Sequence, residues 1–144
     1  MPYSPLLVKP MREELTSAGV EELRTAEDVE RWMEARKGLS MLVINSVCGC
    51  AAGAARPGVR MALEDDEAPE SVATVFAGQD VEATAEARSR FSDIPPSSPS
   101  IALFRDQELV YFVPRHRIET KDAEGVAVDL RQAFERFRAE PAAS

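Results

Sequence analysis

The sequence predicts an α/β sandwich, and we expect residues 1–144 to form a single domain. A chain of 144 residues is long enough to bury a real core, yet short for two domains. Short apolar runs typical of strands alternate with segments of helical periodicity. Residues 41–76 have the pattern strand, helix, strand, which predicts a right-handed parallel crossover. The order and direction of the remaining strands stay open.

The N-terminal region is expected to begin with an extended arm, residues 1–9, because its prolines discourage a helix. The apolar residues of this arm can still pack on the domain. Pro10 suits the first position of a short helix, Met11–Ala18, which Gly19 then ends.

The next two elements are a helix and a buried strand. We expect the helix over Ala26–Lys37, with Thr25 as its N-cap and Gly38 after its end. Trp32 lies on the apolar stripe of this helix and is most simply a core residue. The apolar run Met41–Asn45 then predicts the first strand.

The middle of the chain contains two further helices and a strand. A helix is expected from Cys50 to Glu64, kinked at Pro57 because proline lacks the N–H group of a helical hydrogen bond. The second strand is expected at Val72–Phe76. Asp80 is a good N-cap for the next helix, Val81–Phe91.

The C-terminal third predicts a hairpin followed by a helix. Strands are expected at Ile101–Phe104 and Leu109–Val113, joined by a two-residue turn at Asp106-Gln107. Apolar residues at helical spacing predict the last helix, Asp122–Arg138. The Ala-rich tail, residues 139–144, is expected to be frayed.

Both cysteines of the chain lie between a predicted strand and a predicted helix, in the sequence Cys48-Gly49-Cys50. The free N–H groups and the dipole of a helix N-terminus favour a thiolate, which is the nucleophile in thiol–disulfide chemistry. Gly49 supplies the backbone freedom that a bridge between so close a pair would require. Because such a bridge strains the backbone, we expect a relatively oxidising pair.

Composition narrows the function classes. A net charge of −8 argues against general nucleic-acid binding. The apolar runs are too short to span a bilayer, and the N-terminus has no signal-peptide pattern, so we expect a cytoplasmic protein. Thiols are kept reduced there, which favours a catalytic or metal-binding pair over a structural disulfide. Arg56, Arg115 and His116 give the cysteine region local positive charge, which suits a small anionic ligand.

The chain also resembles the bacilliredoxin family of thioredoxin-like bacterial proteins. The resemblance extends nearly from end to end, and the combination of blocks is far more specific than a lone Cys-x-Cys. The matching blocks are Pro10–Leu15, Glu21–Thr25, Val43–Gly53, Ala55–Val59, Thr74–Asp80, Pro95–Ser100 and Pro114–His116. Three departures are Ala54, where relatives often have asparagine, Asp106-Gln107 in place of the usual Asp-Gly turn, and the absence of another cysteine near the C-terminus.

The resemblance implies a thioredoxin-like three-layer sandwich with a central mixed four-stranded sheet and an N-terminal helical extension. It also implies removal of bacillithiol, a small thiol, from mixed disulfides on client proteins, with weak disulfide isomerase or reductase activity and no bound cofactor. Cys48 corresponds to the attacking cysteine and Cys50 to its partner. Ser98 and Pro99 correspond to the loop whose cis-proline faces the thiols.

We expect the basic residues to bind the ligand, and we keep one alternative function for the cysteines. The fold would bring Arg56, Arg115 and His116 towards the thiols, and an arginine fork matches the carboxylates of bacillithiol's malate group. The rival is a metal or iron–sulfur binding, redox-sensing module that uses Cys48 and Cys50, with His116 as a third ligand. Neither a resident metal nor a membrane or nucleic-acid partner is expected.

Overall fold

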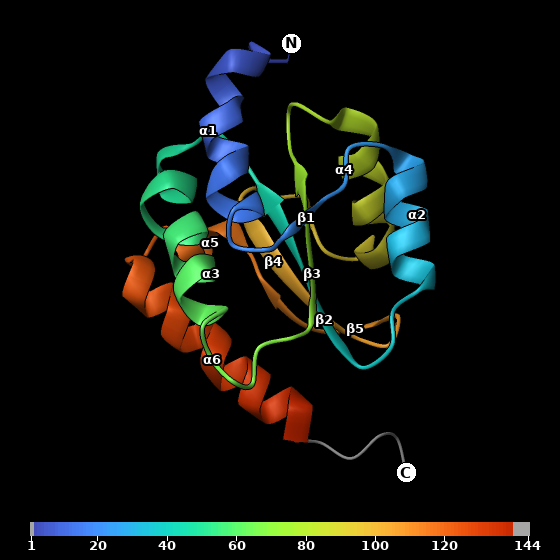
Figure 1. The fold of residues 1–144 in the computed structure, drawn as a ribbon, viewed down its shortest axis with the longest axis vertical. Coiled ribbons are helices and arrows are strands. Elements are labelled where there is room, and N and C mark those ends of the chain that lie inside the picture. Colours follow the sequence, from blue (N-terminus) through green and yellow to red (C-terminus); the bar gives the residue numbers. More distant parts are fainter. Residues whose placement is uncertain (1, 140–144) are drawn as a thin grey trace.

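The computed structural model describes residues 2–139, and its central feature is one five-stranded mixed sheet with helices on both faces. Figure 1 shows α1, α3 and α6 on one side of this sheet and α2 and α4 on the other, which makes three layers. The elements are α1 (Pro5–Thr16), β1 (Glu21–Glu22), α2 (Ala26–Glu34), β2 (Leu39–Asn45), η1 (Ala51–Ala55), α3 (Arg56–Ala62), β3 (Ser71–Phe76), α4 (Val81–Arg88), η2 (Ser89–Phe91), β4 (Ser100–Arg105), β5 (Glu108–Val113), α5 (Arg115–Ile118) and α6 (Ala123–Ala139).

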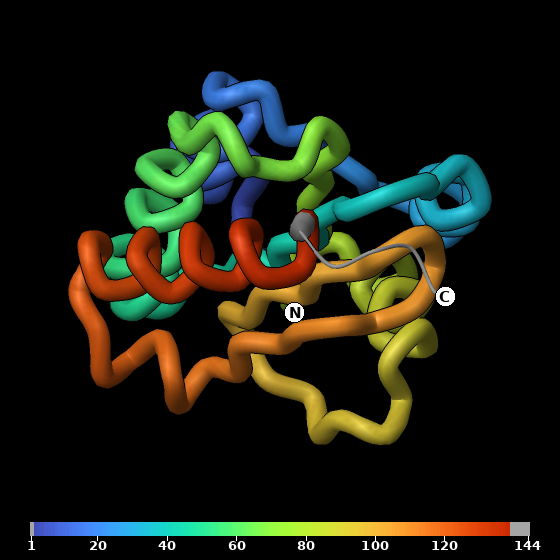
Figure 2. The backbone as a smooth tube through the Cα atoms, turned by 90° about the horizontal axis from the view of Figure 1, so that it is seen from below, coloured from blue at the N-terminus to red at the C-terminus, as the bar shows by residue number. Residues whose placement is uncertain are grey.

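The strand order is β1-β3-β2-β4-β5. Strands β2 and β3 are parallel, so the predicted crossover is confirmed. Strand β4 is antiparallel to β2, and β5 is antiparallel to β4. In Figure 2 the chain leaves the orange β4–β5 hairpin and returns as α6, in red, across one face of the sheet. The sheet therefore has five strands instead of four, because β1 adds a two-residue edge beside β3.

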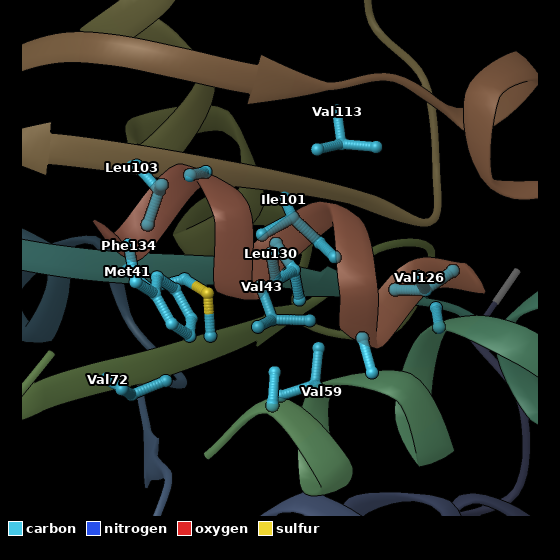
Figure 3. Close-up of a cluster of buried hydrophobic side chains, with 14 of the residues drawn as sticks. Met41, Val43, Val59, Val72, Ile101, Leu103, Val113, Val126, Leu130 and Phe134 are labelled. Atoms are coloured by element: carbon cyan, nitrogen blue, oxygen red, sulfur yellow. The ribbon is translucent and has the colours of Figure 1, made fainter. Parts of the chain in front are cut away.

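Each face of the sheet buries its own apolar core. On the α3 and α6 side, apolar side chains of the strands meet those of the two helices (Figure 3). This cluster includes Met41, Val43, Ile101, Leu103, Val59, Val126, Leu130 and Phe134. The two helices approach closely at Gly58, where a Cβ would lie 2.6 Å from the Cβ of Val126. Only glycine permits that approach. The opposite core includes Trp32, as the sequence predicted.

The N-terminal arm is the main local error of the prediction. Helix α1 begins at Pro5, with Ser4 as its N-cap, and Pro10 lies inside it instead of at its start. Proline fits the first turn of a helix because its missing N–H would have no partner there. Buried Val8 and Leu15 anchor the helix on the domain, so tertiary packing outweighs the cost of the internal proline.

Asp80 also differs from expectation, because its side chain does not cap α4. Its carboxylate instead receives two hydrogen bonds from the buried guanidinium of Arg12, at 2.7 and 3.0 Å. Arg12 also pairs with Glu22 of β1 at 3.2 Å. This cluster ties α1 to the edge strand and to the start of α4.

The segment after the cysteines is helical, but its irregularity is not centred on Pro57. Residues Ala51–Ala55 form a π-helical turn in which the N–H of Arg56 donates to the carbonyl of Ala51. Pro57 lies in the first turn of the α-helix that follows, where proline is tolerated. The sequence predicted a kink at Pro57. The irregularity is instead the π-helical turn, which ends at Ala55, before the proline.

The remaining elements lie close to their predicted positions. Thr25 caps α2 by accepting the N–H of Asp28 at 3.0 Å. The hairpin turn is at Asp106-Gln107, and Asp106 has the positive φ, 57°. Over residues 2–139, none of the helices combines the length and apolar character needed to cross a bilayer. Of the predicted tail, Ala139 ends α6, and residues 140–144 lie outside the described part of the chain.

Candidate active site

The cysteines lie where strand β2 ends and the chain turns into a helix. The backbone N–H of Cys48 donates to the hydroxyl of Ser46 at 3.0 Å, which holds the turn closed. Both cysteines are free thiols, and their sulfur atoms are 2.9 Å apart. Gly49 between them is exposed. The predicted thiol pair is thus assembled within hydrogen-bonding distance.

The two thiols differ in acidity. Partial burial opposes ionisation of Cys48, but hydrogen bonds from Cys50, from the Ser46 side chain and from the N–H groups of Ala51 and Cys50 outweigh it. Together they lower the pKa of Cys48 from 9.0 to about 7. Burial, followed by the hydrogen bond and negative charge of Cys48, raises the pKa of Cys50. Cys48 is therefore the thiol that ionises first and the better candidate nucleophile.

A groove of about 330 Å³ opens beside Cys48. Its lining brings together residues from the N-terminus, the cysteine turn, the β3–α4 loop, the end of α4, the segment before β4 and the start of α5. These residues are Tyr3, Ser46, Val47, Cys48, Ala77, Gly78, Arg88, Ser98 and Arg115. The groove has the size of a small-molecule site, and no acidic side chain is among these lining residues.

Ser98 lines the groove together with Cys48, and Pro99 directly follows Ser98, just before β4. The peptide bond between Ser98 and Pro99 is cis, which confirms the cis-proline that the resemblance implied. Pro99 is buried, whereas Ser98 is partly exposed and lines the groove. The start of β4 therefore forms a wall of the thiol site.

Arg115 lies on α5, directly after β5, and its side chain is exposed. Its guanidinium donates to the carbonyl of Ser98 at 3.5 Å and pairs with Glu119 at 3.3 Å. Negative charge on Cys48, and then on Cys50, raises the pKa of Arg115. The predicted proximity of Arg115 to the thiols is confirmed.

Arg56 was expected to face a ligand beside the thiols, but it is buried inside the protein. Its side chain is only 1% exposed and lies beneath the cysteine turn. The guanidinium donates to Asn45 Oδ1 at 2.9 Å and to the carbonyl of Ser46 at 2.7 Å, and it pairs with Glu14 at 3.1 Å. The prediction that Arg56 faces a ligand is wrong, because these internal acceptors already surround the guanidinium.

His116 is exposed on α5, and it is not one of the residues that line the groove. In the described range 2–139, no group of three or more His, Cys, Asp and Glu side chains is arranged to hold a metal ion. His116 therefore does not join Cys48 and Cys50 in a ligand cluster.

Arg88 and Tyr3 also line the groove, although neither belongs to the predicted site. Arg88 is distant in sequence from the cysteines and belongs to no motif. A weak signal was its place directly after Ala87, on the edge of the buried face of α4. Tyr3 is held by Gln79, whose side chain accepts the Tyr3 N–H at 2.7 Å and donates to the Tyr3 carbonyl at 2.9 Å.

Comparison with known proteins assigns the family. A family model described as disulphide isomerase matches residues 3–138. Bacilliredoxins of Shouchella clausii and Cytophaga hutchinsonii are 51% and 52% identical to the chain. Each alignment covers 92% of this chain, and they cover 91% and 98% of the two relatives. The chain belongs to the bacilliredoxin family.

Solved structures agree on the fold. A putative oxidoreductase with a thioredoxin fold has a TM-score of 0.60 at 15% identity, over 78% of this chain and 93% of that one. A mutant thioredoxin from Halobacterium salinarum has a TM-score of 0.57 at 15% identity, over 85% and 93% of the two chains. The fold of this bacilliredoxin is thus thioredoxin-like. Family and fold together make it a thiol–disulfide oxidoreductase.

Proposed function

We propose that this bacilliredoxin removes bacillithiol from mixed disulfides on client proteins, with Cys48 as the nucleophile. The observation that carries the proposal is geometric. Cys48 opens onto a groove with an arginine on its rim, while its partner Cys50 lies 2.9 Å away, close enough to act on an adduct. Weak disulfide isomerase activity follows from the same thiol exchange. A reducing compartment such as the cytoplasm would keep both thiols free.

The first step is a thiol–disulfide exchange. The Cys48 thiolate attacks the bacillithiol sulfur of the mixed disulfide, and a Cys48–bacillithiol disulfide forms as the old disulfide bond breaks. The electron pair of the broken bond goes to the client's sulfur, which leaves as a thiolate and takes a proton from water. The client is reduced, and the oxidised equivalent passes to Cys48.

The second step removes bacillithiol from Cys48. A free bacillithiol thiolate can attack the adduct, which releases oxidised bacillithiol and restores the Cys48 thiolate. Alternatively, the Cys50 thiolate attacks Cys48 Sγ, which forms the internal disulfide and releases bacillithiol. That disulfide then needs two further thiols: one attacks it to form a mixed disulfide, and the second releases both cysteines and carries the oxidation away as a small-thiol disulfide. Burial, followed by the hydrogen bond and charge of Cys48, raises the pKa of Cys50, so less of Cys50 is thiolate while Cys48 is charged; the contribution of that charge is removed once Cys48 carries the adduct.

The acidity of Cys48 supports its role in this exchange. With a pKa of about 7, roughly half of Cys48 is thiolate at pH 7, against about 1% for a thiol at 9.0, a gain of about 50-fold. The lower basicity costs about 8-fold in nucleophilicity at a Brønsted slope of 0.4–0.5. The net gain is about 6-fold at neutral pH.

The test is intact-mass analysis of three reduced proteins, wild type, Cys48→Ser and Cys50→Ser, incubated with a client protein bacillithiolated on one cysteine. We expect the adduct to accumulate on Cys50→Ser and not on Cys48→Ser, with a free client thiol in the same sample. Wild type should show either little adduct or the loss of two mass units that marks an internal disulfide.

Two results would contradict the proposal. An adduct on Cys48→Ser would assign the attack to Cys50. If no variant accepts bacillithiol while wild type reduces a glutathione-linked client or rearranges scrambled disulfides, the exchange chemistry stands and bacillithiol is not the substrate.

A further inference from the structure

The groove beside Cys48 contains an arginine that the proposed chemistry has not used. Arg88, the last residue of α4, lines the groove and donates through Nη2 to the carbonyl of Ser97 at 3.3 Å. Its buried Nε has no hydrogen-bond partner in the part of the chain that the structure describes. Within that part no carboxylate lies within ion-pairing distance of Arg88. The guanidinium is therefore a groove-lining cation that the protein leaves unneutralised.

This arrangement is unfavourable for the free protein. Burial lowers the pKa of Arg88, because partial removal of water penalises the charged form. Buried cations are normally paired, and an unmade hydrogen bond on a charged group is costly. The neighbouring Arg90 also has a buried Nε without a hydrogen-bond partner, but its charge is balanced by an ion pair with Glu86 at 3.1 Å. A carboxylate in the groove would give Arg88 the partner that Arg90 already has.

Arg115 flanks the same stretch of backbone. Its Nη1 contacts the carbonyl of Ser98, while Arg88 binds the carbonyl of the preceding residue, Ser97. Two guanidinium groups are thus attached to consecutive carbonyls in the segment that faces Cys48. Arg115 already shares its charge with Glu119, so Arg88 is the less neutralised of the two cations.

We infer that Arg88 binds a carboxylate of the small thiol that Cys48 takes up, with Arg115 as an auxiliary cation. The ligand class is a low-molecular-weight thiol that carries at least one carboxylate near its sulfur. Arginine suits this role because its fork can bind a carboxylate through two hydrogen bonds. The inference rests on the proposed function and makes it more specific, since Arg88 would select anionic over neutral thiols.

The test uses one client protein whose single cysteine carries either mercaptosuccinate, an anionic thiol, or 2-mercaptoethanol, a neutral one. Transfer to Cys48 is followed by intact mass in the Cys50→Ser background, with and without Arg88→Gln. We expect Arg88→Gln to slow transfer of mercaptosuccinate about tenfold, as for one lost charge-assisted contact, and transfer of 2-mercaptoethanol less than twofold. The matched control is Arg90→Gln, whose arginine does not line the groove.

Equal slowing of both transfers by Arg88→Gln would assign Arg88 a structural role and overturn the inference. Unchanged transfer of both would also overturn it. A second measurement does not depend on transfer: succinate, compared with neutral succinamide at equal ionic strength, should protect Cys48 from alkylation by iodoacetamide. That protection should be lost in Arg88→Gln. If Cys50→Ser with Arg88 intact transfers neither adduct, the proposed function fails, and the protection experiment still decides the carboxylate site.

Discussion

The two sides of the cysteine turn contain arginines in opposite surroundings. On the inner side, Arg56 is 1% exposed and is surrounded by Asn45, the carbonyl of Ser46 and Glu14. On the outer side, Arg115 is exposed and Arg88 is half-buried at the edge of a groove. The inner cation has its acceptors within the protein, whereas the outer cations have donors left for a ligand.

This difference in surroundings indicates two roles: the inner arginine stabilises the cysteine turn, and the outer arginines are available to a ligand. Arg56 holds the end of β2 and the first residue of the turn, and Ser46 in turn accepts the N–H of Cys48. Its effect on the chemistry is therefore indirect. In the proposed role, the outer arginines would act on negative charge that enters the groove, so their effect would depend on the substrate and on salt. The same residue type supports the turn or binds a ligand according to which acceptors surround it.

The largest expected effect is on stability, at the inner side. Arg56→Leu leaves buried Asn45 Oδ1 and the Ser46 carbonyl without this donor, which should lower the free energy of unfolding by about 3 kcal/mol. Arg115→Gln should leave that free energy unchanged within error. Urea unfolding followed by circular dichroism measures both. Arg56→Lys keeps the charge and should lose less, and equal stability of Arg56→Leu and wild type would show that the inner network contributes nothing.

The second effect concerns the pH dependence of Cys48. Because the folded pKa is about 7, alkylation by iodoacetamide should fall about fivefold from pH 7 to pH 6 and level off above pH 8. Cys50→Ala removes the thiol donor and should move the midpoint upward, and Ser46→Ala should do so to a smaller degree. An alkylation rate that continues to rise to pH 9 in wild type would mean that the turn does not stabilise the thiolate.

The smallest expected effect is on the salt dependence of Cys48 alkylation, which should differ between Arg115 and the hydrogen bonds of the turn. Arg115→Gln removes an exposed charge near the thiols, so alkylation at pH 7 and low salt should slow only about twofold. At about 1 M NaCl, where the Debye length is about 3 Å, that difference should disappear. The effect of Ser46→Ala should persist, because a hydrogen bond at contact distance is little screened. If the effect of Arg115→Gln did not change with salt, Arg115 would act on the thiols through a direct contact and not through long-range charge.

Prediction from sequence worked best where local chemistry decides the structure. Thr25 caps α2, and the apolar run at Met41–Asn45 forms most of β2. It failed where packing opposes a local rule. Pro2 and Pro5 argued against a helix in residues 1–9, yet α1 begins at Pro5, and buried Val8 and Leu15 anchor it on the domain. Strand β1 was missed because two residues have no periodicity, and only pairing with β3 defines them.

By itself the sequence determined the reactive pair and its setting. Cys48 and Cys50 follow a buried strand, and the family resemblance, confirmed by the comparisons, identifies the domain that contains them. Only the tertiary structure decided which arginine lies in the site. Arginine is solvated by default, so no pattern marks Arg56 as buried or Arg88 as part of the groove. That assignment depends on acceptors from distant segments, and folding alone brings these together.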